Sequence, residues 1–339
     1  MEFRRRVQFA VGLPLVRGGQ APAGRIGPVR WLAECSVEAL TEALRGVAPE
    51  LAAHRIVLPE LVGRVDPLWR SSSASLGEEF VAKFAWSELA ARRLAHEVGV
   101  LGALGGNSEV PFLPEVVVGS VDPVLLVTRR VRGRSLFAVV DSIDRDRAGE
   151  QLARFLTALN RPATRERVER AVGELPIPRP QSSTADLRAR FGKWVRPDQR
   201  ETVARWCDWA DAVLATEGPA VLVHGDLHGD NQVWCEGQLR LVVDFETAGS
   251  SEPEYDLRAF PGTGPGVELL TATLRHYREL AGRGLSVERV MAWHLRTALD
   301  DALWRSEAGV ALPDHRTPAD WVRDLAARFD ALGLDAGRS

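Results

Sequence analysis

Short apolar runs interrupted by polar positions predict small elements in the first part of the chain. Residues 36–47 show the apolar spacing of an amphipathic helix, with Ser36 at its N-cap. Two strand-like runs follow at residues 55–65 and 78–86. Residues 70–79 between them are rich in serine, which predicts a turn.

The hydrophobic period then changes twice. Residues 87–104 carry apolar side chains on one helical stripe, and residues 114–133 predict a hairpin that turns at Asp122 and Pro123. The order of elements from residue 58 to residue 132 is therefore strand, strand, helix, strand, strand. This order is typical of a small lobe that combines a sheet with one helix.

Helical periodicity dominates the rest of the chain. Helices are predicted over residues 146–159 and 200–216, and a long helix capped by Ser286 is predicted to end near residue 307. A short strand leads into residue 224, and a hairpin follows with its turn at residues 236–237. The pattern therefore predicts a larger, mostly helical second part.

One loop carries many polar side chains directly after that short strand. It has the sequence HGDLHGDN, and Asp244 follows Asn231 by thirteen residues at the end of LRLVVDF. A strand, a loop and a hairpin in this order would bring Asp226, Asn231 and Asp244 together. A carboxylate and an amide carbonyl suit a hard cation, and a further carboxylate can accept or orient a hydroxyl proton. Phosphoryl transfer requires these groups.

Such a site also needs a cation for nucleotide phosphates, and lysine is rare in this chain. Only Lys83 and Lys193 occur among 43 basic residues. Strand alternation puts Val81 and Lys83 on one face, where Val81 can cover a base while the ammonium reaches phosphate. The lysine needs a carboxylate partner, and Glu97 in the following helix is the first candidate, with Glu88 as the alternative.

These segments resemble the aminoglycoside phosphotransferase family of small-molecule kinases, within the protein-kinase-like superfamily. The motifs that carry the resemblance are VAKF, HEVGVL, HGDLHGDN, VVDFE and EPEYDL. The loop has H-G-D where protein kinases have H-R-D, which favours the small-molecule branch. The similarity spans roughly residues 58–305. It implies an α+β fold of two lobes, with a small antiparallel sheet and one helix in the N-lobe and a larger helical C-lobe.

The resemblance also implies a role for each residue. Asp226 would be the catalytic carboxylate, and Asn231 and Asp244 would bind Mg²⁺. Lys83 would hold the α- and β-phosphates of ATP, with GTP left open as the nucleotide. Glu97 would hold the lysine. The acceptor would be a hydroxyl group of a small molecule, such as an aminoglycoside-like antibiotic, a sugar or an amino alcohol.

Supporting positions follow from the same comparison. His224 and Asp256 are expected to hold the catalytic loop. The backbone at Thr128, Arg129 and Val131 would form the hinge between the lobes and bind the edge of the adenine base.

The phosphate loop departs from the family pattern. Residues 63–77 contain no G-x-G-x-x-G, and Ser72 and Ser73 are the predicted phosphate-capping residues because of their backbone and hydroxyl donors. Glu246 occupies the position of the glycine in the D-F-G motif of protein kinases. This argues against a D-F-G-type switch but not against a metal role for Asp244.

Three regions are predicted from these assignments. Residues 1–57 form an N-terminal extension with a short helix, residues 58–128 form the nucleotide-binding N-lobe, and residues 129–339 form the helical C-lobe with the acceptor site.

Composition limits the partners. The net charge of −3 gives no reason to expect nucleic acid or an anionic membrane, and no apolar run reaches the length of a membrane span. The start of the chain resembles a secretory signal, with three arginines before an apolar run. However, Gly12 and Pro14 break that run, and a kinase needs ATP, so a cytoplasmic location is predicted. The oligomeric state is left open.

Two questions stay open at this level. An acidic set could bind a polycationic acceptor, although a solvated face with helical i,i+4 partners such as Asp301 and Arg305 is favoured. The set consists of Asp230, Glu246, Glu252, Glu254, Asp300, Asp301 and Glu307. The alternative to a kinase is a weak or inactive kinase-like module that binds a nucleotide or metabolite.

Overall fold

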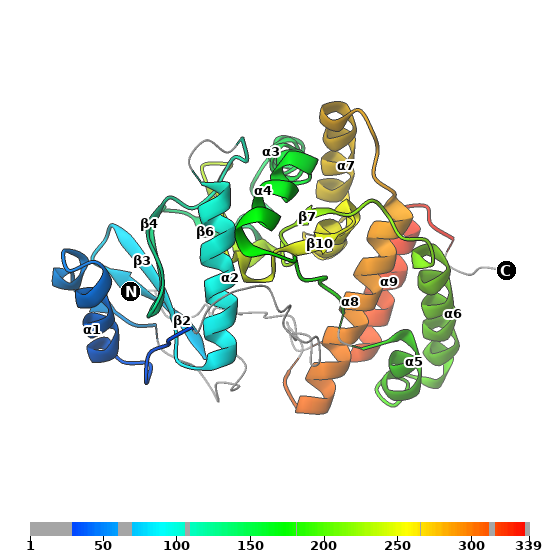
Figure 1. Cartoon of the computed structure of the whole chain (residues 1–339). Helices are drawn as coiled ribbons and strands as arrows, with labels where there is room; N and C mark the ends of the chain where they lie inside the picture. The colour runs from blue at the N-terminus through cyan, green and yellow to red at the C-terminus, as the bar shows by residue number, and fades with distance from the viewer. Residues whose placement is uncertain are drawn as a thin grey trace.

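The computed structural model describes residues 29–59, 70–105, 109–180, 182–264, 266–311 and 316–335. They form two lobes, a small one built on a sheet and a larger, mostly helical one (Figure 1). The α+β class and the two-lobed arrangement predicted from the sequence are confirmed. Among the helices of these residues, none combines the length and apolarity that crossing a membrane requires.

The small lobe is an antiparallel sheet with a helix on each face. Within the described residues its strand order is β1-β2-β3-β5-β4. The predicted hairpin and both predicted helices are present, and the Ser36 side chain caps the first helix by accepting the N–H of Ala39. The elements are α1 (Val37–Val47), β1 (Ile56–Val57), β2 (Ser71–Leu76), β3 (Phe80–Ala85), α2 (Glu88–Leu104), β4 (Val116–Val121) and β5 (Val124–Arg129).

Helix α1 shares the hydrophobic core of this sheet. Leu40 and Leu44 are fully buried, in one cluster with Leu76, Phe84 and Leu125. Burying one leucine side chain contributes about 1.5–3 kcal/mol, so the helix is anchored firmly. The predicted boundary between extension and N-lobe therefore divides residues that pack together, and it remains a prediction.

The turn predicted for residues 70–79 is wrong. Ser71–Leu76 form strand β2, which pairs with β1 on one side and β3 on the other. Ala74 and Leu76 alternate into the core, and this burial outweighs the low strand preference of serine. The turn is confined to the next residues, where Gly77 has a φ of 56°. Of the first predicted strand, residues 56–57 form β1, and residues 60–69 lie outside the described residues.

The large lobe contains the HGDLHGDN loop (residues 224–231) within a framework of helices. The predicted strand, the hairpin β8–β9 and the long helix capped by Ser286 are all present. Helices α4, α7 and α9 add to the elements predicted. The main elements are β6 (Arg134–Ser135), α3 (Arg145–Leu159), α4 (Pro162–Val172), α5 (Thr184–Asp186), α6 (Pro197–Leu214), β7 (Val221–Val223), β8 (Gln232–Cys235), β9 (Gln238–Val242), β10 (Gly249–Ser251), α7 (Glu268–Ala281), α8 (Val287–Ala308) and α9 (Pro318–Ala331).

Within the described residues, five short helical segments lie between these elements. They are η1 (Leu51–Ala53), η3 (Leu136–Ala138), η5 (Gly229–Asn231), η6 (Phe245–Thr247) and η7 (Pro253–Gly262), and one π-helical turn, η4 (Leu187–Phe191), lies before α6.

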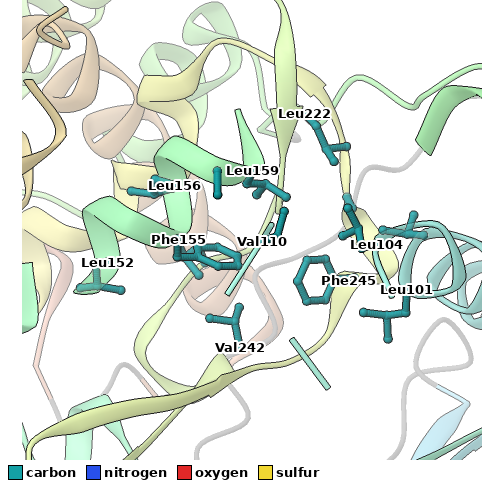
Figure 2. Close-up of a cluster of buried hydrophobic side chains, with 14 of the residues drawn as sticks. Leu101, Leu104, Val110, Leu152, Phe155, Leu156, Leu159, Leu222, Val242 and Phe245 are labelled. Atoms are coloured by element: carbon teal, nitrogen blue, oxygen red, sulfur yellow. The ribbon is translucent and has the colours of Figure 1, made fainter. Parts of the chain in front are cut away.

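One hydrophobic cluster joins the lobes. Leu101 and Leu104 of α2 pack with Phe155 and Leu159 of α3 and with Phe245, directly after Asp244 (Figure 2). This packing fixes α2 against the segment that follows β9. It therefore sets the distance between Glu97 on α2 and the residues around Asp244.

Candidate active site

The predicted catalytic loop begins at the end of β7, and Asp256 holds its backbone. The Asp256 carboxylate accepts the backbone N–H groups of His224 (2.7 Å) and Gly225 (2.9 Å). Gly225 has a φ of 83°, and a Cβ there would collide with the Thr247 carbonyl, so only glycine fits. Asp256 is fully buried, and burial raises the pKa of its carboxyl group. Its contacts are those of a group that fixes the backbone.

His224 connects the loop with the strand that leads to Asp244. Its Nε2 lies 2.9 Å from the Val243 carbonyl, and its Nδ1 accepts the N–H of Asp226 at 3.2 Å. Burial lowers the pKa of His224, and the nearby carboxylates of Asp256 and Asp226 oppose this only in part. A neutral imidazole with the proton on Nε2 satisfies both contacts. The side chain therefore orders the loop without carrying a charge.

Asp226 lies between two groups that can carry positive charge. Its Oδ2 is 3.4 Å from Nε2 of His228, and its Oδ1 is 3.6 Å from Nη2 of Arg258. Burial raises the pKa of Asp226, but His228 and Arg258 outweigh burial and lower it. Burial lowers the pKa of His228, and Asp226 raises it above its ordinary value. The carboxylate is therefore held in its ionised form.

Asn231 is the last residue of η5 and lies next to Asp226, just before β8. Its side-chain Nδ2 donates to the backbone carbonyl of Asp226 at 2.8 Å. The backbone carbonyl of Asn231 accepts the N–H of Val243 at 2.9 Å. The amide nitrogen is thereby occupied, which leaves Oδ1 as the side-chain ligand atom. The spacing of five residues from Asp226 is thus explained by a tight turn that Asn231 closes.

Lys83 brings the small lobe into the site. Its Nζ lies 2.6 Å from Oε2 of Glu97, 2.5 Å from Oδ1 of Asp244 and 3.3 Å from Oε2 of Glu246. Burial alone would lower the pKa of Lys83, but the three carboxylates raise it well above its usual value. Glu88, the alternative partner, instead pairs with Arg92 on the exposed side of α2. The ammonium group therefore keeps its charge and is surrounded by acidic groups.

Glu97 bonds a residue from each lobe. Its Oε2 accepts a hydrogen bond from Nζ of Lys83, and its Oε1 accepts one from the backbone N–H of Phe245 at 3.1 Å. The side chain is 3% exposed, and burial raises its pKa although Lys83 opposes this. The cluster of Figure 2 fixes the helix that carries it.

Asp244 adopts an unusual backbone conformation. Its φ of 71° and ψ of 60° lie in the left-handed region, which aspartate tolerates better than most residues. Its side chain is 35% exposed, more than that of its neighbours Glu97 and Glu246. The carboxylate is therefore accessible to a ligand.

Glu246 belongs to the candidate site, whereas the sequence predicts it only as a member of the acidic set. The segment η6 turns its side chain toward Lys83, and only 8% of the side chain is exposed. Burial, with Asp244 and Glu97 nearby, raises its pKa to about 7 although Lys83 opposes this. Carboxylate oxygens of Glu97, Asp244 and Glu246 lie within 4.8 Å of one another, so the cluster has the composition of a cation site. The available signal was its position two residues after Asp244.

The predicted nucleotide residues lie along β3 and its neighbours. Val81 pairs with Thr128 of β5, and Lys83 pairs with Ser73 of β2. Ser72 stands opposite Phe84 in the same ladder. Both serines therefore lie in a strand and not in a loop, and their phosphate-capping role stays a prediction.

The hinge residues continue from the end of β5. The side chain of Arg129 pairs with Glu115 at 3.1 Å and covers the ring of Phe80. Val131 lies beyond the strand and is half-buried. The segment thus connects the sheet with the large lobe, and its role as a hinge stays a prediction.

Most members of the acidic set are buried, and two of them pair with arginines. Glu252 pairs with Arg289, and Asp301 pairs with Arg305 at 2.9 Å, as the i,i+4 spacing predicted. Four members are buried, which differs from the solvated face expected. They are Glu252, Glu254, Asp300 and Asp301. These carboxylates balance internal partners, and the set does not form an acidic surface for a polycation.

A family profile described as "Phosphotransferase enzyme family" matches residues 63–294. No curated protein sequence is significantly similar to the chain. Among solved structures, the GDP complex of wild-type aminoglycoside 2'-phosphotransferase-IIIa superposes with a TM-score of 0.61 at 18% identity, over 87% of this chain and 98% of that chain. The GDP and kanamycin complex of a 2"-phosphotransferase gives a TM-score of 0.61 at 17% identity, over 87% and 98% of the two chains.

A macrolide 2'-phosphotransferase from Brachybacterium faecium, without ligand, gives a TM-score of 0.54 at 19% identity, over 85% of this chain and 98% of that chain. These similarities show that the chain has the fold of the aminoglycoside and macrolide phosphotransferases.

Proposed function

Because the chain belongs to the phosphotransferase enzyme family, we propose that it is a kinase that transfers the γ-phosphate of ATP to a hydroxyl group of a small molecule. The observation that supports this most is the convergence of Lys83, Glu97 and Asp244 from two lobes beside the loop of Asp226 and Asn231. GTP is the alternative donor, since two similar structures contain GDP. A supply of ATP makes the cytoplasm the proposed location.

In this proposal the small lobe holds the nucleotide. Val81 covers the base, and the backbone from Thr128 to Val131 binds its edge. Lys83 is charged at all physiological pH values and contacts the α- and β-phosphates, and Glu97 directs its ammonium group. Burial of the pair strengthens these contacts, because solvent screens them less.

The donor set fits Mg²⁺, which takes oxygen ligands and several waters. Asn231 Oδ1 and the Asp244 carboxylate would hold it, and when bound it neutralises charge on the phosphates. Asp244 contacts Lys83 in this structure, so the ammonium group and the metal would share this carboxylate.

Asp226 is the proposed general base. Its carboxylate orients the acceptor hydroxyl and accepts the proton, while the hydroxyl oxygen forms the bond to the γ-phosphorus. The bond from that phosphorus to the β,γ-bridging oxygen breaks, and ADP leaves. The lowered pKa of Asp226 keeps the carboxylate ready for this role.

The acceptor class is proposed only as a hydroxylated small molecule. Kanamycin is present in one similar structure, and another is a macrolide enzyme. The internal pairing of Glu252 and Asp301 removes the argument for a polycationic acceptor that rested on the acidic set. An antibiotic acceptor would make the protein a resistance enzyme, whereas a sugar or amino alcohol would make it metabolic.

The test is coupled ADP release from magnesium–ATP across aminoglycosides, macrolides, sugars and amino alcohols, with Asp226→Ala as the matched control. Acceptor-stimulated release that disappears in the variant is expected. Tight binding of magnesium–ATP without any release would instead support a nucleotide-binding module and overturn the kinase assignment.

A further inference from the structure

Arg258 in η7 is a buried arginine beside the catalytic loop, two residues after Asp256. Its side chain is 5% exposed. Nη2 donates to the Gly225 carbonyl at 2.7 Å, and Nη1 donates to the Tyr255 carbonyl at 3.1 Å. Because Asp256 accepts the N–H of Gly225, the two side chains hold this residue from opposite sides.

The guanidinium group is fixed independently of the loop. It lies over the ring of Tyr255, with Cζ 4.1 Å from the ring centre. The backbone carbonyl of Arg258 is 2.7 Å from Nδ1 of His294 on α8, and Nη1 of Arg328 on α9 is 2.8 Å from the other ring nitrogen. Helices α8 and α9 therefore set the position of the arginine.

The carboxylate of Asp226 lies next to Arg258 but forms no hydrogen bond with it. Its Oδ1 lies 3.6 Å from Nη2 of Arg258, and this buried oxygen has no hydrogen-bond partner in the described residues. The two carbonyl groups hold the guanidinium back from a direct bidentate pair. The result is a positive charge near the carboxylate and a free lone pair on it.

We propose that Arg258 is a positioning residue for the phosphoryl transfer, and this inference rests on the proposed function. It fixes the Gly225–Asp226 backbone and places a positive charge 3.6 Å from Oδ1 of Asp226, while it leaves this oxygen free to receive the acceptor proton. A purely structural residue would need only the donors to the carbonyl groups. The distance to Asp226 gives the charge itself a function.

The test compares Arg258→Lys, which keeps the charge, with Arg258→Gln, which removes the charge and keeps a hydrogen-bond donor on a shorter side chain. Arg289→Gln is the control, because Arg289 is also a partly buried arginine that bonds a carbonyl (Val213, 2.8 Å) and a carboxylate (Glu252), but away from the loop. ADP release is measured with magnesium–ATP and water alone, then with the panel compound that stimulates wild type most. Thermal unfolding is followed for every variant.

We expect kcat to fall about a hundredfold in Arg258→Gln and about tenfold in Arg258→Lys, with KM for magnesium–ATP within about threefold of wild type. Arg289→Gln should lose stability but retain kcat. In an Asp226→Asn background, Arg258→Gln should have little further effect, because the two residues act together.

Several results would overturn the inference. They are a kcat of Arg258→Gln within about twofold of wild type, equal losses for the lysine and glutamine variants, and a loss confined to KM for magnesium–ATP. A wild-type protein that releases no ADP under any condition would overturn the proposed function, and the inference with it. An active wild type with unaffected variants would overturn the inference alone.

Discussion

The surroundings of Lys83 and of Asp226 have opposite charge balances. Three carboxylates surround the ammonium group of Lys83, whereas an arginine and a histidine flank the single carboxylate of Asp226. The first region has spare negative charge for a divalent cation, and the second keeps one carboxylate ionised. The comparison shows that local pairing decides the chemistry, while the net charge of −3 reveals neither region.

The largest expected effect comes from the single carboxylate. Asp226→Asn keeps the size of the side chain but removes the base, so kcat should fall about a thousandfold. Binding of magnesium–ADP, followed by tryptophan fluorescence, should stay near wild type because Lys83 and its partners are unchanged. A kcat near that of wild type would show that Asp226 is not the general base.

A smaller effect is expected where several carboxylates share one lysine. In Glu97→Gln, Asp244 and Glu246 still hold Lys83, so kcat/KM for magnesium–ATP should fall only about tenfold, or ~1.4 kcal/mol. Glu88→Gln on the exposed side of α2 is the matched control and should change nothing. A loss of activity as large as that of Asp226→Asn would mean that Asp244 and Glu246 cannot replace Glu97 as partners of Lys83.

The acidic region should also affect stability in a pH-dependent way. Glu246 has a pKa raised to about 7 in the folded protein, so folding favours its protonated form. Its contribution to the free energy of unfolding should therefore decrease as the pH rises from about 4.5 to about 7, and level off above that.

Glu246→Gln removes this titration. The difference in unfolding free energy between wild type and Glu246→Gln, measured by denaturation at pH 5 and pH 8 without metal, should change by about 2 kcal/mol in favour of the variant at pH 8. A difference independent of pH would contradict the raised pKa.

The smallest effect on activity is expected away from both regions. Leu44→Ala in α1 should lower the free energy of unfolding by about 2–4 kcal/mol, because it leaves a cavity under the sheet. The kcat value should change by less than about twofold, since α1 contacts neither region. Leu89→Ala, at an exposed position on α2, is the control and should have little effect on stability. Equal stabilities would show that α1 does not belong to the N-lobe core.

Much of the fold and site is encoded in local sequence pattern. Periodicity and capping residues such as Ser36 and Ser286 determine the helices, because these preferences act within a few residues. The spacing of Asp226, Asn231 and Asp244 reflects a strand, a turn and a hairpin, which are also local. The choice of Glu97 over Glu88 follows from which helix face meets the sheet.

Tertiary packing decided what local pattern does not contain. Ser71–Leu76 became a strand because two neighbouring strands pair with it. Glu246 faces Lys83, and Asp301 is buried beside Arg305, because packing rather than composition sets the direction of each side chain. Arg258 reaches Asp226 only because α8 and α9 hold its segment against the loop. Sequence determines which groups are available, and contacts between distant residues determine which of them meet.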